Sequence, residues 1–292
     1  MTDLTPVTAP TGWNDAPVGV FDSGLGGLSV LRAVRAQLPD EAVIYAADSR
    51  YAPYGERDDD FIVDRTLAIG EWLVAQGVKA LVVACNTATA QSIEQVRARL
   101  PIPLIGVEPG VKPASLQSAT RVAGVLATQV TLRSGRFQSL LDRHAADCHF
   151  LLQPGHGLVQ AVERCDIDSP ELRALLEGYL QPMLDAGADT LVLGCTHYPF
   201  LDATIRSIVG DRLTLIDTSV AIARQLERVL DERGLRARPG RAADALMPRF
   251  CSTSDGAHLR QLAATLLHLD APVEQVTIPS RRTLALEDSA AA

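Results

Sequence analysis

Long apolar runs, clustered positive charge and a secretion signal are all missing from this 292-residue sequence. No run approaches the roughly 18 apolar residues of a membrane-spanning helix, and the opening segment is polar and acidic rather than signal-like. The net charge of −8 disfavours a nucleic-acid partner, because phosphate backbones are bound by clustered lysines and arginines. We therefore expect a cytoplasmic protein that has neither a membrane nor a nucleic acid as a partner.

Lysine is scarce, since the chain contains only Lys79 and Lys112. An enzyme that uses pyridoxal phosphate needs a lysine for its Schiff base. Lys79 precedes a predicted strand and so lies at the wrong edge of a sheet, whereas Lys112 follows another strand and could reach a cleft. A pyridoxal-phosphate enzyme stays a lesser alternative, and we expect no cofactor.

Aromatic residues make up only 4% of the chain, although 47% of it is hydrophobic. This mixture, rich in Ala, Val and Leu, favours layered parallel α/β structure over a β-sandwich. Short β-branched runs alternate with segments of helical period, which is typical of βαβ units. The predicted strands are Val18–Phe21, Ala42–Ala46, Ala80–Val83, Leu104–Val107, Val122–Leu126, His149–Leu152, Thr190–Leu193 and Leu213–Ile216.

An internal duplication divides the chain into two similar units. GVKALVVACN at residues 77–86 aligns without a gap to GADTLVLGCT at residues 187–196, so that Cys85 falls on Cys195. A weaker echo joins the segment GVFDS to the segment GVLAT. The sequence therefore predicts an α/β fold of two pseudo-symmetric parallel-sheet domains that face each other across an interdomain active-site cleft.

The limits of these domains follow from the same pattern. After Ile216 the chain continues with a long helical segment and a strand near Met247–Ser252, which could pack back on the first half and make that domain discontinuous. The predicted limits are a flexible N-terminal segment at 1–17, a first domain at 18–111 plus 217–280, a second domain at 112–216 and a flexible C-terminal tail at 281–292.

The two aligned cysteines are the candidates for chemistry. Without an export signal, the five cysteines of the chain are expected to be reduced thiols. Ligands of an open parallel sheet gather beyond the carboxyl ends of its strands, where Cys85 and Cys195 both lie. Inversion at an α-carbon needs a base on one face and an acid on the other, which two thiols could supply. The plainer interpretation is that both are small residues tolerated at crowded strand ends.

Polar residues next to the thiols offer further candidates. Asn86 and Thr87 could donate to a bound carboxylate, although capping of the next helix explains either one. His197 stands two residues from Cys195 and could tune its protonation, although a lone histidine is more often structural. Asp22 at the tip of the first strand could move the proton of Cys85, although an Asx-turn is its ordinary role.

Two loops complete the set. The glycines of FDSGLGGLSV let backbone N–H groups approach an anion closely, but Ser29 replaces the last glycine of a dinucleotide fingerprint. In ADSRYAPYG the Tyr54 hydroxyl and the Gly55 backbone could bind one end of a small dicarboxylate. Asp48 and Arg50 in the same loop are as readily turn and surface residues as ligands.

FDSGLGG, PYG, CNT and GCTHYP together resemble the glutamate racemases in order and spacing, and the resemblance covers roughly Val18 to Pro279. It implies cofactor-independent racemisation of L- and D-glutamate by two thiols, which supplies D-glutamate for bacterial peptidoglycan. By resemblance Cys85 serves D-glutamate and Cys195 serves L-glutamate, assisted by Asp22 and His197. The implied substrate contacts are Asp22, Ser23, Tyr54, Gly55, Asn86, Thr87, Thr196 and His197.

One segment departs from the family pattern. Many glutamate racemases carry a Leu-Val-Glu-like stretch where this chain reads LLQPGHGLVQAVE. If that glutamate assists the second thiol, its role here falls to His156, to Glu163 or to no residue.

Three other functions stay open from the sequence. An aspartate racemase or a related isomerase would share the CNT motif. Two cysteines and His197 could bind zinc, but their spacing matches no compact zinc motif, and we expect no metal. An amino-acid-binding clamp would need the donors but not the paired thiols. The resemblance also leads us to expect a homodimer with glutamate as its small-molecule substrate.

Overall fold

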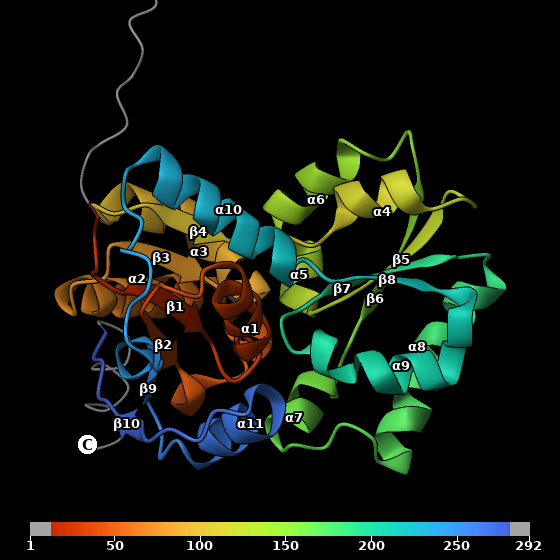
Figure 1. Cartoon of the computed structure of the whole chain (residues 1–292). Coiled ribbons are helices and arrows are strands. Elements are labelled where there is room, and N and C mark those ends of the chain that lie inside the picture. Colours follow the sequence, from red (N-terminus) through yellow and green to blue (C-terminus); the bar gives the residue numbers. More distant parts are fainter. Residues whose placement is uncertain (1–12, 281–292) are drawn as a thin grey trace, which may run out of the picture.

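The computed structural model describes residues 13–280. Two sheets, A and B, lie side by side, with sheet A on the left and sheet B on the right of Figure 1. The predicted flexible tail at 281–292, and residues 1–12 of the predicted flexible N-terminal segment, lie outside the described residues. Within the described part of the chain, no helix is long and apolar enough to cross a membrane.

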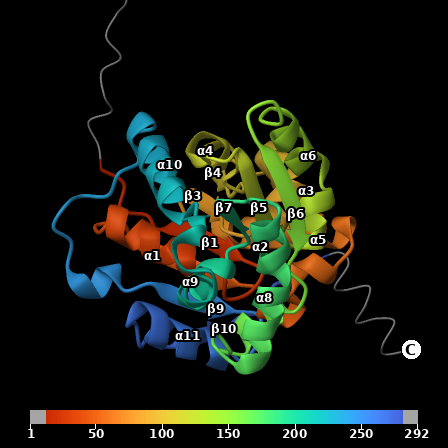
Figure 2. The same ribbon diagram turned by 90° about the vertical axis from the view of Figure 1, so that its right-hand side faces the viewer.

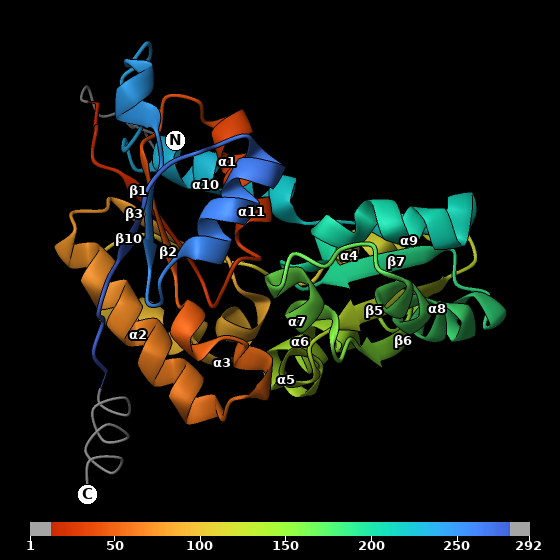
Figure 3. The ribbon, with the colours of Figure 1, turned by 90° about the horizontal axis from the view of Figure 1, so that it is seen from below.

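Sheet A has the strand order β10-β9-β2-β1-β3-β4, and all of its pairs are parallel. Figure 3 shows α2 and α3 on one face of this sheet and α1, α10 and α11 on the other. The bounds are β1 Val18–Asp22, α1 Leu28–Gln37, β2 Val43–Ala47, α2 Asp59–Ala75, β3 Ala80–Val83, α3 Asn86–Arg99, β4 Leu104–Gly106, α10 Ser219–Glu232, β9 Arg249–Ser252, α11 Ala257–Leu267 and β10 Val273–Gln275.

Sheet B has the order β6-β5-β7-β8 and is also parallel throughout. Its elements are α4 Val111–Gln117, β5 Val122–Ala127, α5 Gln129–Arg133, α6 Gly135–Asp142, β6 His149–Pro154, α7 Leu158–Glu163, α8 Pro170–Asp185, β7 Thr190–Gly194, α9 Asp202–Val209 and β8 Thr214–Ile216. Short 3₁₀ turns complete the chain: η1 Ser49–Tyr51, η2 Tyr54–Glu56, η3 Tyr198–Leu201, η4 Gly210–Arg212 and η5 Ala243–Leu246.

The predicted fold class is confirmed, since two parallel α/β domains are present. The strand that follows α10 returns to sheet A and pairs with β2, and β10 then pairs with β9. β10 is a strand that the sequence pattern did not predict. The exact domain limits remain a prediction, which the membership of the two sheets supports.

Burial on both faces explains why the strands are nearly continuous apolar runs. Side chains alternate between the two faces of a strand. In β7, Leu191 and Leu193 join the apolar cluster that contains Leu176 of α8, whereas Val192 joins the cluster that contains Phe137 of α6. Helices therefore cover both faces of sheet B, as parallel sheets require.

Strand register decides which residues meet at the edge of each sheet. Asp22, the last residue of β1, pairs with Ala47 of β2, and Ala127 of β5 pairs with Gly194 of β7. The residues that follow these strands therefore emerge at the carboxyl edge of their sheets. Figure 2 shows α3 of the sheet A domain beside α5 and α6 of the sheet B domain, on the opposite side from α1 and α10.

Truncation of Leu176 to alanine is expected to lower the free energy of unfolding by about 2–5 kcal/mol, because the side chain is fully buried and its loss leaves a cavity. Leu116→Ala is the matched control, since Leu116 is 73% exposed, and it should change that free energy by less than about 0.5 kcal/mol. Urea denaturation with an unchanged slope measures both values. Equal effects of the two substitutions would contradict the packing of α8.

Candidate active site

The first thiol lies at the start of α3. Cys85 is buried, and its Sγ accepts a hydrogen bond from the Ala88 N–H at 3.4 Å and lies 3.4 Å from the Ser23 hydroxyl. Burial, together with the nearby Asp22 carboxylate, raises the pKa of Cys85 to about 12. Cys85 is therefore a protonated thiol near neutral pH, which is the state of a proton donor.

The second thiol lies beyond the end of β7 and has a different set of partners. Cys195 Sγ is 3.6 Å from His197 Nδ1, and His197 Nε2 is 2.6 Å from a carboxylate oxygen of Glu163. Burial lowers the pKa of His197, but the hydrogen bonds with Cys195 and Glu163 outweigh it and raise that pKa well above its usual value. A protonated imidazole favours the thiolate form of a neighbouring cysteine.

Asp22 joins the two domains. One carboxylate oxygen accepts from the Gly24 N–H at 2.8 Å, as in an Asx-turn, and the other accepts from the Thr196 hydroxyl at 3.1 Å. Burial raises the pKa of Asp22, although the charge of His197 opposes the shift. Asp22, which was predicted to act on Cys85, thus also forms a hydrogen bond with Thr196, the residue that follows Cys195.

The glycine-rich loop after β1 receives side chains of the other domain. The Leu25 N–H donates to the Glu163 carboxylate at 2.8 Å, so the anion that this loop binds is part of the protein itself. A Cβ atom on Gly24 would overlap the Glu163 carboxylate, and one on Gly26 would overlap the His197 ring. These two glycines are therefore needed for close approach of the second domain.

Ser29 has a role in the same contact. Its hydroxyl donates to the Thr196 carbonyl at 3.0 Å and to the Gly26 carbonyl at 2.9 Å. The serine that breaks a dinucleotide fingerprint thus fastens the loop after β1 to the loop after β7.

Polar groups gather beside Cys85. Asn86 is buried, and its side-chain nitrogen has no hydrogen-bond partner in the part of the chain that the structure describes. The Thr87 hydroxyl lies 2.9 Å from the Thr128 hydroxyl, which in turn donates to Thr131 at 2.9 Å. A buried donor without a partner is costly, which fits a site that receives an acceptor from a ligand.

Thr128 and Thr131 belong to none of the motifs that indicated candidate residues. Thr128 closes GVLAT, the segment that echoes GVFDS, and it therefore stands at the position that Ser23 holds in the first unit. Applying the duplication to every strand, rather than to the cysteine strands alone, would have indicated this hydroxyl.

The Tyr54 hydroxyl is already engaged by a residue of its own loop. It is buried and donates to the Asp48 carboxylate at 2.6 Å, so Asp48 is an interior residue rather than a surface one. A Cβ atom on Gly55 would lie 3.2 Å from Thr128 Cβ, which places the Gly55 backbone against the sheet B domain. The structure thus brings the Gly55 backbone to the interdomain boundary and binds the Tyr54 hydroxyl to Asp48.

Glu163, and not His156, lies against the second thiol's histidine. His156 is exposed, and only its carbonyl is recorded in a hydrogen bond, which it accepts from Tyr179. Gln160, one helical turn before Glu163, donates to Glu56 of the sheet A domain. The carboxylate beside His197 is therefore supplied from the end of α7.

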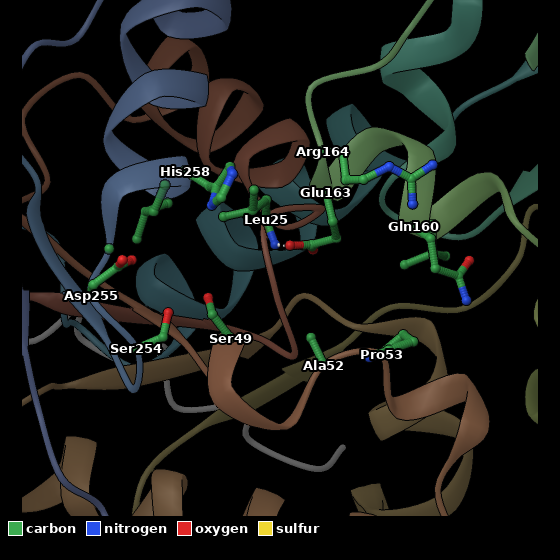
Figure 4. A pocket seen from close by; sticks show the side chains of 13 residues that line it. Leu25, Ser49, Ala52, Pro53, Gln160, Glu163, Arg164, Ser254, Asp255 and His258 are labelled. Atoms are coloured by element: carbon green, nitrogen blue, oxygen red, sulfur yellow. Dashed lines mark hydrogen bonds between the residues drawn. The ribbon is translucent and has the colours of Figure 1, made fainter.

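A cavity of 330 Å³ opens on the outer side of Glu163. Figure 4 shows Glu163 bonded to Leu25 on one side of this cavity, with Ser254, Asp255 and His258 on the other. The Glu163 side chain is 21% exposed, whereas that of His197 is 4% exposed. Glu163 thus stands between the buried thiol site and the cavity.

The two lysines and the possible metal ligands are the remaining candidates from the sequence. Lys79 pairs with Glu41 and precedes β3, at the far edge of sheet A, and Lys112 is exposed on α4. Among residues 13–280 there is no group of three or more His, Cys, Asp or Glu side chains that could hold a metal ion.

Comparisons with known proteins agree with this geometry. Residues 27–226 match the family described as Asp/Glu/Hydantoin racemase. The chain is 58% identical to the glutamate racemase of Cupriavidus pinatubonensis over 265 residues, which cover 91% of this chain and 96% of that protein.

Two solved structures have the same fold. Glutamate racemase from Escherichia coli, in complex with L-glutamate and the activator UDP-MurNAc-ala, is 31% identical with a TM-score of 0.79, and the match covers 91% of this chain and 100% of that one. Glutamate racemase from Francisella tularensis in complex with D-glutamate is 28% identical with a TM-score of 0.78, covering 90% and 98%. The chain described here belongs to the Asp/Glu/hydantoin racemase family and is, within it, a glutamate racemase, an isomerase.

Proposed function

We propose that this glutamate racemase inverts its substrate by a two-thiol mechanism without a cofactor. The observation that carries the proposal is the contrast between the two buried cysteines. Cys85 has a raised pKa and lies beside a serine hydroxyl, whereas Cys195 lies beside a protonated imidazole that is itself held by a carboxylate. One thiol is thus set to donate a proton and the other to accept one.

In the direction from L- to D-glutamate, the Cys195 thiolate removes the α-proton from one face of the substrate. The His197 imidazolium stabilises that thiolate before the transfer, and Glu163 holds the imidazole in place. The Cys85 thiol then delivers its own proton to the opposite face. The reaction ends with a thiol at Cys195 and a thiolate at Cys85, which is the state that starts the reverse reaction.

Asp22 is proposed to assist Cys85. Its raised pKa makes the carboxyl group easier to protonate than an ordinary aspartate, which favours proton exchange with the thiolate left at Cys85. The same carboxyl group accepts from Thr196 and so also fixes the loop that carries Cys195.

The substrate is proposed to lie between the two thiols, held by donors that the fold leaves available. The Asn86 side-chain nitrogen, which lacks a partner among the described residues, binds one carboxylate together with the hydroxyl of Thr87. Ser23 and Thr196 supply further hydroxyls, and the backbone of Tyr54 and Gly55 binds the other carboxylate. The bound L- and D-glutamate of the two related structures support glutamate as the ligand here.

The biological assignments that follow from the resemblance are proposals as well. They are supply of D-glutamate for peptidoglycan, a cytoplasmic location and a homodimer. Racemisation of aspartate stays the second candidate, and the assay below decides it by substrate choice.

Loss of the α-proton NMR signal in D₂O, from L-glutamate and from D-glutamate separately, is expected for the wild-type enzyme with no cofactor added. Circular dichroism should decay to zero from either enantiomer. Cys85→Ser and Cys195→Ser should each slow racemisation by at least about 100-fold, because each removes one acid/base group.

Cys148→Ser is the control for these variants, since Cys148 is also buried but precedes β6, where its Sγ donates to the His149 carbonyl. It should racemise glutamate at the wild-type rate. An absence of exchange by wild-type enzyme in reduced, chelator-free buffer would refute glutamate racemisation for this chain, and aspartate would be tested next.

Replacement of Glu163 by glutamine is expected to move the alkaline limb of the kcat/KM profile to lower pH. The Glu163 hydrogen bond raises the pKa of His197, so its weakening lowers that pKa and the imidazolium is lost at lower pH. We expect kcat/KM at neutral pH to fall about 10-fold, the equivalent of one charge-assisted hydrogen bond.

Glu56→Gln serves as the comparison for Glu163→Gln, because Glu56 contacts Gln160 of the same helix but not His197. Its pH profile should match that of the wild type. Identical profiles for Glu163→Gln and wild type would show that Glu163 does not set the protonation of His197.

A further inference from the structure

Two opposite charges are completely buried where β2 ends. Asp48 follows β2, Arg65 belongs to α2, and the side chains of both are 0% exposed. The guanidinium donates to both carboxylate oxygens, from Nη2 at 2.7 Å and from Nε at 3.0 Å. Burying two charges costs several kcal/mol per ion, so such a pair persists only with good geometry and further hydrogen bonds.

Further donors complete the bonding of Asp48. The oxygen bound by Nη2 also accepts from the Thr253 hydroxyl at 3.0 Å, and the oxygen bound by Nε also accepts from the Tyr54 hydroxyl at 2.6 Å. Each oxygen therefore receives two hydrogen bonds, which leaves Asp48 no position for substrate. The carboxylate instead connects α2, the end of β9 and the turn η2.

Arg65 is also fastened on its far side. Its Nη1 donates to the Ile278 carbonyl at 2.5 Å, and its guanidinium lies 4.4 Å from the centre of the Tyr51 ring. Arg65 thus contacts the loop between β2 and α2 through Tyr51 and connects this loop to the segment that follows β10.

The connected turn faces the thiol site. The Tyr54 ring packs on Phe21 of β1 at a centroid distance of 6.3 Å and belongs to the same apolar cluster as Cys85. The next residue, Gly55, lies against Thr128 of the sheet B domain. A shift of the Tyr54 ring would therefore move the Gly55 backbone at the interdomain boundary.

We propose that Asp48 and Arg65 form a positioning pair, which holds the Tyr54–Gly55 backbone where it binds the substrate. The inference rests on the proposed contact of that backbone with one carboxylate of glutamate. The pair touches neither thiol, so its weakening loosens substrate binding and leaves proton transfer in the bound complex largely intact. The expected signature is a rise in KM that exceeds the fall in kcat.

A second buried ion pair in the same domain provides the control. Lys79 Nζ lies 2.5 Å from a Glu41 oxygen, and the two side chains are 1% and 2% exposed. These residues precede β3 and β2, so the pair lies at the amino edge of sheet A, away from both cysteines. Its loss removes buried charge pairing without touching the loop at Tyr54.

The experiment compares Asp48→Asn with Glu41→Gln, each of which neutralises the acid of one buried pair with little change of shape. Tyr54→Phe is the milder third variant, because it removes one hydrogen bond to Asp48 and no charge. For each variant, KM and kcat are measured for L- and D-glutamate, and thermal unfolding is followed. We expect KM to rise about 10-fold in Asp48→Asn and about 3-fold in Tyr54→Phe, for both enantiomers.

Glu41→Gln should lower the unfolding temperature as Asp48→Asn does, but leave KM within about 2-fold of wild type. Unchanged KM values in folded Asp48→Asn and Tyr54→Phe would overturn the proposal and make the pair purely structural. Should Asp48→Asn fail to fold, Tyr54→Phe decides alone. Failure of the proposed glutamate chemistry is recognised separately, since wild-type enzyme would then racemise neither enantiomer.

Discussion

The site depends on one contact between the two domains. The glycine loop after β1 packs against two side chains of the sheet B domain, those of His197 and Glu163. Leu25 donates to Glu163, and Asp22 accepts from Thr196, so the two sheet edges are joined by one partly buried and one buried hydrogen bond. This approach is possible because two positions of the loop lack a Cβ atom. Without it the two thiols would belong to separate domains with no common substrate position.

The duplicated architecture places equivalent cysteines at equivalent strand ends, but it does not make them chemically equivalent. Cys85 is buried and lies near a carboxyl group, and both features favour its protonated form. Cys195 instead lies beside a histidine, which a carboxylate holds from its other ring nitrogen. In the mechanism that we propose, the backbone symmetry brings the two thiols to opposite sides of one substrate, and the unequal side chains let one thiol donate a proton and the other accept one. A two-base inversion needs both properties at once.

Much of this arrangement follows from local sequence pattern. Strand and helix periods gave the parallel sheets, and the gapless alignment of GVKALVVACN with GADTLVLGCT identified the two thiols. Contacts between distant side chains carry no such signal. Glu163 lies 34 residues from its partner His197, and the Tyr54–Asp48 bond depends on a buried arginine from α2. The sequence pattern therefore left the partner of His197 undecided and wrongly allowed Asp48 to be a surface residue.

The direct hydrogen-bond partners of each thiol come from its own domain. Ser23 and Ala88 contact Cys85 from the sheet A domain, whereas His197 and Glu163 belong to the sheet B domain with Cys195. Each thiol therefore has its direct partners within one domain, but charges also act across the boundary, since His197 opposes the rise in the pKa of Asp22. In our proposal the buried pair at Asp48 acts from the sheet A domain, because it holds the Tyr54–Gly55 loop, which lies against Thr128. The protonation of the site thus depends on both domains, and the proposed substrate position lies between them.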